Sequence, residues 1–67
     1  MLNITINGEP RQFSGARNVA SVVEALELTG KRIAVERNGE IVPKSQHAAT
    51  ALEPGDRLEI VVAVGGG

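Results

Sequence analysis

Residues 33–43 read Ile33-Ala34-Val35-Glu36-Arg37-Asn38-Gly39-Glu40-Ile41-Val42-Pro43. Asn38-Gly39 stands between two short runs that suit β-strands, and both residues tolerate the positive φ angles of a two-residue hairpin turn. We therefore predict a β-hairpin with strands over 33–37 and 40–42. Pro43 ends the second strand because proline has no N–H to offer a continuing ladder.

A second hairpin with the same turn chemistry is predicted at the start of the sequence. Apolar and polar residues alternate from residue 1 to residue 6, the period of a half-buried strand. Asn7-Gly8 follows as the turn, and residues 11–13 form the return strand. A two-residue turn places Phe13 opposite Leu2, so both side chains belong to the core face.

One helix is predicted between the two hairpins. Val19, Val22, Val23 and Leu26 recur at helical spacing and form a single apolar stripe. Asn18 suits the N-cap, where its side chain accepts a backbone N–H of the first turn. Gly30 is the predicted stop signal beyond the helix.

The rest of the sequence predicts a loop and a final strand. Residues 44–52 read as a loop with a short helical turn, and residues 54–56 as a tight turn. A strand is predicted over 58–64. Its core face holds Leu58, Ile60, Val62 and Val64, and its outward face holds Glu59, Val61 and Ala63.

This order of elements predicts an α+β fold. The helix must cover one face of a mixed sheet, because two hairpins alone would leave an apolar face in water. With the final strand placed centrally beside the first, the arrangement is a β-grasp, with the sheet packed on one main helix. We expect one β-grasp domain over 1–64 and a flexible glycine tail over 65–67.

Composition excludes several classes of function. The 67 residues carry a formal net charge of −1 and one aromatic residue, Phe13, which argues against a nucleic-acid-binding protein. No apolar run approaches the roughly 20 residues that cross a bilayer, and the first residues do not form a signal peptide. The absence of cysteine is compatible with a reducing compartment, so we expect a cytoplasmic protein without membrane contact.

Catalytic and metal sites are not predicted. His47 has no second histidine and no cysteine with which to bind a metal, and we expect it to be a solvated surface residue. The serines have no recognisable general base, and the turn glycines are not followed by the lysine and helix of a phosphate-binding loop. No catalytic residue and no bound cofactor is therefore expected in this chain.

The last strand leads into Gly65-Gly66-Gly67, where the sequence ends. Three residues without a Cβ can adopt any backbone conformation and enter a narrow channel. Such a tail can deliver its α-carboxylate into the active site of another protein. A carboxylate is a poor electrophile, so it must be activated there, and attachment to a nucleotide phosphate would make it an acyl donor for a sulfur nucleophile.

Three segments resemble a known family: residues 33–43, the run Gly55-Asp56-Arg57-Leu58-Glu59-Ile60-Val61 and the end Val64-Gly65-Gly66-Gly67. They are similar to the ThiS family of sulfur carriers in thiamin biosynthesis, part of the ubiquitin-like MoaD–ThiS superfamily. The resemblance covers essentially the whole chain. Asn18 departs from the family pattern, which often has threonine there, and Ala63 stands where bulkier side chains are common.

The resemblance implies a carrier and co-substrate rather than an enzyme. A ThiF-like enzyme would adenylate Gly67 with its own ATP and Mg²⁺. Sulfur from a cysteine desulfurase would then convert the carboxylate of Gly67 into a thiocarboxylate. A ThiG-like thiazole synthase would use that sulfur to build thiazole phosphate, with Gly65 and Gly66 as the flexible stem.

Residues beside the tail are predicted to contact partners. Val61 and Ala63 place apolar side chains on the face away from the helix, and Val64 adjoins the glycines. Three rival functions stay open at this point: a sulfur carrier of molybdopterin synthesis, a protein modifier joined to lysines through Gly67, and a non-reactive β-grasp binding module.

Overall fold

The computed structural model describes residues 1–63; Val64, Gly65, Gly66 and Gly67 lie outside the described residues. The predictions made for these four residues, and the division into 1–64 and 65–67, therefore stay predictions. In chain order the elements are β1 (Leu2–Ile6), β2 (Glu9–Phe13), α1 (Val19–Ala25), β3 (Ile33–Arg37), β4 (Glu40–Val42), the 3₁₀ turn η1 (Lys44–Gln46) and β5 (Arg57–Val62).

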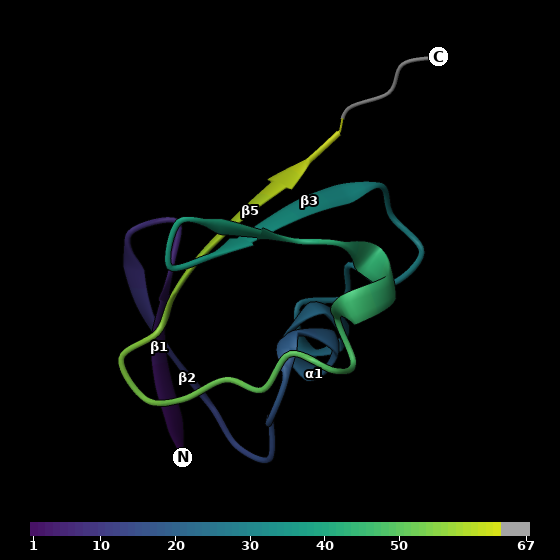
Figure 1. The fold of residues 1–67 in the computed structure, drawn as a ribbon. Helices are drawn as coiled ribbons and strands as arrows, with labels where there is room; N and C mark the ends of the chain where they lie inside the picture. Colours follow the sequence, from purple (N-terminus) through teal and green to yellow (C-terminus); the bar gives the residue numbers. More distant parts are fainter. Residues whose placement is uncertain (64–67) are drawn as a thin grey trace.

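The five strands form one mixed sheet in the order β2-β1-β5-β3-β4. Strand β5 is central and runs parallel to β1, whereas the other pairs are antiparallel. The helix α1 lies on the concave side of the curved sheet, as Figure 1 shows. The predicted β-grasp arrangement is confirmed.

Both hairpin turns adopt the predicted geometry. Asn7 and Gly8 have φ angles of 51° and 83°, and Asn38 and Gly39 have φ angles of 50° and 87°. The turn fixes the register so that Leu2 lies opposite Phe13, as predicted. Strand β2 begins two residues earlier than expected, because the two-residue turn carries pairing directly on from β1.

The core fills the space between the concave side of the sheet and the helix. The most completely buried side chains come from both layers: Val19 and Val22 from α1, Val35 from β3 and Leu58 from β5. Phe13, Leu26, Leu28 and Ile33 pack against this core from its margins. The valine stripe of α1 thus serves as the apolar face that the sequence predicts.

The N-terminus of α1 is capped as predicted, but its C-terminus is not. The Asn18 side chain accepts the Ser21 N–H at 2.8 Å. The helix ends at Ala25, and the residue with positive φ that terminates it is Glu27 (φ 60°) rather than Gly30. The Leu28 N–H returns to the Val23 carbonyl at 3.0 Å, which is the Schellman pattern with glutamate in the glycine position.

The final strand is shorter than predicted. Strand β5 ends at Val62, so Ala63 lies beyond it and residue 64 is outside the described residues. Val62 was expected in the core and is 41% exposed. The reason is its position: β1 pairs with β5 only as far as Leu58, so Val62 has a neighbouring strand on the β3 side alone.

The prediction for His47 is wrong. Its side chain is only 9% exposed, and its Nε2 lies 3.2 Å from the Val42 carbonyl oxygen. Because a carbonyl only accepts, Nε2 is the donor. The His47 carbonyl also accepts the Ala20 N–H of the helix. His47 therefore joins the segment after η1 to both β4 and α1.

Candidate functional site at the end of strand β5

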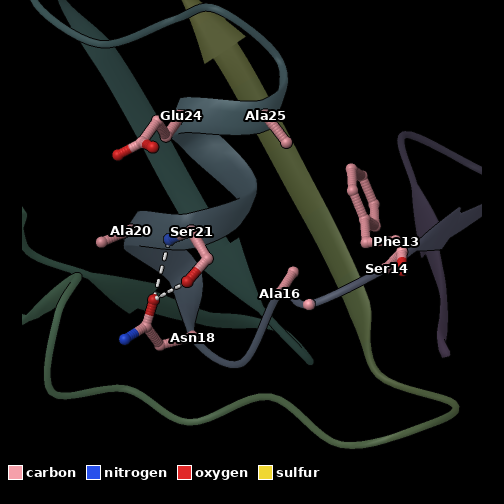
Figure 2. A pocket seen from close by; sticks show the side chains of 9 residues that line it. Phe13, Ser14, Ala16, Asn18, Ala20, Ser21, Glu24 and Ala25 are labelled. Carbon is pink, nitrogen blue, oxygen red and sulfur yellow. Dashed lines mark hydrogen bonds between the residues drawn. The ribbon is translucent and has the colours of Figure 1, made fainter.

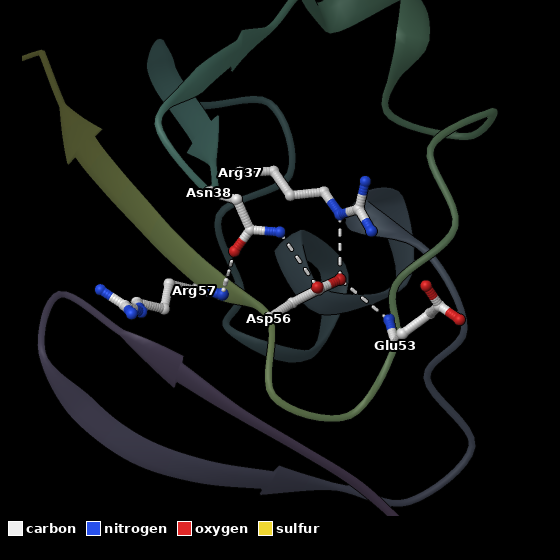
Figure 3. A network of polar contacts seen from close by, with 5 residues as sticks. All are labelled: Arg37, Asn38, Glu53, Asp56 and Arg57. Carbon is white, nitrogen blue, oxygen red and sulfur yellow. Dashed lines mark hydrogen bonds and ion pairs between the residues drawn. The ribbon is translucent and has the colours of Figure 1, made fainter.

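Strand β5 begins in a polar network centred on Asp56, which is 8% exposed. Its Oδ2 accepts the Arg37 Nε–H and the Glu53 N–H, each at 2.9 Å. Its Oδ1 accepts the Asn38 amide at 3.1 Å, and the Asn38 Oδ1 accepts the Arg57 N–H at 2.9 Å (Figure 3). The network ties the β3–β4 turn to the first residue of β5.

The pKa of Asp56 reflects two opposing effects. Burial raises the pKa of its carboxyl, because a charged group loses hydration there. Hydrogen bonds from the Glu53 backbone, Asn38 and Arg37, with the positive charge of Arg37, lower it by more. The pKa is therefore below the ordinary aspartate value, and Asp56 is ionised at neutral pH.

The middle of β5 is held from the other side by Asn7. The Asn7 side chain accepts the Ile60 N–H at 2.8 Å and donates to the Ile60 carbonyl at 3.0 Å. Its backbone N–H donates to the Leu58 carbonyl at 2.9 Å. The Asn7 side chain thus continues the hydrogen bonding between β1 and β5 as far as Ile60, although β1 itself ends at Ile6.

The end of β5 is different, because Val61 and Val62 are exposed to 64% and 41%. Val61 pairs with Ala34, and Glu59 pairs with Glu36, so these four side chains share the face away from the helix. Beyond the strand, the Ala63 N–H donates to the Arg32 carbonyl at 2.8 Å. This end is bonded to β3 and leaves apolar side chains accessible.

Ile41 extends the same exposed surface onto β4. It is 75% exposed and pairs with Glu36. We call Ala34, Glu36, Ile41, Glu59 and Val61 the outward patch. Val61 lies on the outward face as predicted, and both Val61 and Ala63 are exposed; their role in docking stays a prediction.

A hollow beside the helix lies elsewhere and offers no catalytic arrangement. This pocket of about 490 Å³ is lined by the Phe13–Ala16 connection and one side of α1. Figure 2 shows that the Ser21 hydroxyl turns to the Asn18 Oδ1, which it reaches at 2.6 Å, rather than to a general base. The serine is therefore part of the helix cap.

Among residues 1–63, no group of three or more potential metal-binding side chains comes together. Within the same residues, no helix is both long and apolar enough to cross a membrane. What the described residues do provide is a central strand fixed at its start and accessible at its end.

Fold and site together define a class: a small β-grasp protein whose central strand presents its final residues at the surface. The sequence matches the ThiS family over residues 4–67. The chain belongs to the ThiS family.

Solved structures agree with this assignment. The fold is similar to the crystal structure of the thiamine biosynthesis protein ThiS from Geobacter metallireducens, with a TM-score of 0.81 and 35% identity. The similarity covers 98% of this chain and 100% of that one. The solution structure of a thiamine biosynthesis protein from the same organism gives a TM-score of 0.79 at 35% identity, with 98% of this chain and 88% of that one covered.

Sequence relatives fall into two groups by length. The chain is 47% identical over 66 residues to the thiazole synthase of Paramagnetospirillum magneticum. This match covers 98% of this chain but only 20% of that protein. It is 35% identical to the uncharacterized protein ycf40 of Pyropia yezoensis, with 98% of this chain and 93% of that protein covered.

Proposed function

We propose that this chain carries sulfur for thiazole formation in thiamin biosynthesis, and that the α-carboxylate of Gly67 is its reactive group. The supporting observation is the match to the ThiS family, which runs through Gly67. Gly65 and Gly66 would form a stem narrow enough for a partner's channel, because neither carries a Cβ.

The chemistry proceeds in two displacements. The Gly67 carboxylate attacks the α-phosphorus of ATP, and pyrophosphate leaves, which gives an acyl adenylate. A sulfur nucleophile at the oxidation level of sulfide then attacks the acyl carbon, and AMP leaves with one of the original carboxylate oxygens. The product is a thiocarboxylate, and the adenylating partner supplies ATP, Mg²⁺ and the catalytic groups.

Thiazole synthase is the proposed acceptor of the sulfur. Two proteins that bear this name, from Paramagnetospirillum magneticum and Magnetococcus marinus, each match this chain over 20% of their length. In them a segment similar to this carrier is part of the same polypeptide. Joining two partners raises their effective concentration, so the arrangement supports a functional association between the carrier and the synthase.

The outward patch is the proposed docking surface for the adenylating enzyme. Val61 and Ile41 are exposed apolar side chains in a small protein, and such surfaces frequently mark interaction sites. Ala63 and Val64 would extend the contact toward the tail. The anchored start of β5 keeps this surface in a fixed relation to the sheet, so a partner that binds it also locates the emerging tail.

One experiment tests the reactive group. The chain with an unblocked C-terminus is incubated with the adenylating enzyme, ATP and a sulfide source, and its intact mass is measured. We expect one oxygen to be replaced by sulfur in the wild type, and no exchange after deletion of Gly67 or addition of a C-terminal tag. Exchange that persists in the tagged chain would place the reaction elsewhere.

A further inference from the structure

A second accessible surface lies on the helix side of the sheet, beside the end of β5. It is a pocket of about 370 Å³ between α1, the connection that follows it, the first residue of β3 and the segment after Pro43. Its apolar side chains are Val23, Leu28 and Ile33, with contributions from two alanines. This pocket, which we call the α1–β3 pocket, is large enough for one or two apolar side chains of a partner.

Positive charge surrounds the α1–β3 pocket. Lys31, Arg32 and Lys44 line it, together with a single acidic residue, Glu24. Among residues 1–63 only Arg37 and Asp56 form an ion pair, so the three cations have no carboxylate partner in this part of the chain. An excess of positive charge around an apolar floor favours a partner of opposite charge.

The pocket is continuous with the end of β5. Ile33, which lines the pocket, pairs with Val62, and paired residues of antiparallel strands point to the same face. The Arg32 carbonyl accepts the Ala63 N–H. A partner that receives the residues after Ala63 would therefore lie within reach of the α1–β3 pocket as well as of the outward patch.

The two surfaces beside the strand end differ in charge. The outward patch carries Glu36 and Glu59, and Arg57 lines the same hollow as these two acids, whereas three cations surround the α1–β3 pocket. An acidic segment would therefore match the cations of the pocket better than the mixed charges of the outward face. The chain therefore offers two chemically distinct contacts at the place where its tail emerges.

We propose that the α1–β3 pocket is a docking site for thiazole synthase, and that it takes an apolar side chain flanked by carboxylates from that protein. This inference rests on the proposed function. Thiazole synthase is the occupant because proteins of that name contain a segment similar to this chain. The charges of the pocket select an acidic segment, and its apolar floor selects the side chain between the acids.

The first test locates the contact by NMR. Unlabelled thiazole synthase from the same organism is added to the ¹⁵N-labelled chain, and the backbone amide signals are followed. We expect the largest shifts or broadening at residues 28–33 and at Ala20 and Ala48, which line the pocket. Changes confined to the outward patch would overturn the proposal.

The second test reverses charge at the pocket. The double variant Lys31→Glu/Arg32→Glu should bind thiazole synthase about tenfold more weakly, because attraction becomes repulsion at two positions. Its matched control is Arg11→Glu/Arg17→Glu, which makes the same change in net charge at exposed positions away from the pocket. Equal weakening in both variants would show a general charge effect and overturn the proposal.

The mass measurement separates this inference from the proposed function. The pocket variant should acquire sulfur at the wild-type rate and fail later, in thiazole formation. Normal sulfur loading with normal binding to the synthase would refute the pocket alone. Absence of loading in the wild type would refute the proposed function, whatever the NMR shows. Slow loading in the pocket variant would assign the pocket to the adenylating enzyme and overturn our choice of occupant.

Discussion

The first and last residues of β5 are held in different ways. At the start, Asp56 and Arg57 bond to the β3–β4 turn, and further along the Asn7 side chain bonds to Ile60 from the β1 side. At the end, Val61 and Val62 pair with β3 alone. One strand thus has a portion fixed from both sides and a portion fixed from one.

This difference suits the proposed function, in which the C-terminal residues are presented to partner enzymes. The fixed portion passes through the core, where Leu58 and Ile60 are buried, and sets the direction in which the chain leaves the sheet. The end keeps the apolar side chains of Val61 and Val62 free for contact. Different residues of the same strand therefore contribute to stability and to partner contact. Substitutions at the start and at the end of β5 should affect the two properties separately.

The largest expected effect is at the start of the strand. Asp56→Ala should lower the free energy of unfolding by about 3 kcal/mol, because three donors in a partly buried network lose their acceptor. Denaturant unfolding measures the change. Glu59→Ala is the control: this exposed carboxylate of the same strand should matter by less than about 0.5 kcal/mol. An equal loss of unfolding free energy in both variants would show that the Asp56 network does not hold the start of β5 more firmly than its exposed positions.

The Asp56 network should also make stability depend on pH in one direction. A carboxyl with a lowered pKa in the folded state stabilises the fold above the unfolded pKa, which is about 3.9, and loses that contribution as pH falls through the folded value. The stability difference between the wild type and Asp56→Asn should be constant from pH 7 to about 5 and shrink in more acid solution. Thermal unfolding at a series of pH values measures it; a difference that shrinks between pH 7 and 6 would contradict the assignment.

A smaller effect is expected from the two asparagine side chains that hold β5. Asn7→Gly and Asn38→Gly keep a residue that tolerates positive φ and remove the side-chain hydrogen bonds, while glycine also adds conformational freedom to the unfolded chain. Each should cost about 1 kcal/mol. Hydrogen exchange distinguishes them: the Ile60 amide should exchange faster in the first variant and the Arg57 amide in the second. If exchange is unchanged at both amides, the two asparagines stabilise the fold through their turn conformation alone and not through their side-chain hydrogen bonds to β5.

Much of the fold could be predicted because local signals agreed with one another. The two Asn-Gly pairs gave the hairpins and their register, and Asn18 with the valine stripe gave the helix. The central place of β5 was predicted from the β-grasp arrangement, in which the last strand lies beside the first. The hairpins and the helix depend on φ preferences and on period, both of which are local properties of a sequence.

The features that could not be predicted depend on long-range contacts. Asn7 was recognised as a turn residue, but its bonds to Ile60 span 53 positions and leave no local signal. His47 lies in a polar stretch without periodicity, so nothing indicated that it would be buried beneath the Val42 carbonyl. Glu27 occupies a position that usually favours glycine, which is why the helix end was placed too late.

The candidate site shows the same division. Alternation in the last strand correctly placed Val61 on the outward face, yet it also placed Val62 in the core. Period gives the face of a side chain but not whether another element covers that face. Lys44 is distant in the sequence from Lys31 and Arg32, and only the fold brings the three cations around one pocket.

The smallest effect on stability is expected at the end of the strand, where the effect on function should be largest. Val61→Asp should change the free energy of unfolding by about 0.5 kcal/mol, since the side chain is 64% exposed. It should nevertheless slow adenylation of the tail, because a charge replaces an apolar contact beside Glu59 in the outward patch. Gln12→Asp, which adds an acid at an exposed position of the distant edge strand β2, is the matched control. The measurement is the rate at which the adenylating enzyme adenylates each variant. If Val61→Asp is adenylated as fast as Gln12→Asp, the end of β5 is exposed without being a docking surface. The contrast between the two portions of the strand would then concern stability alone.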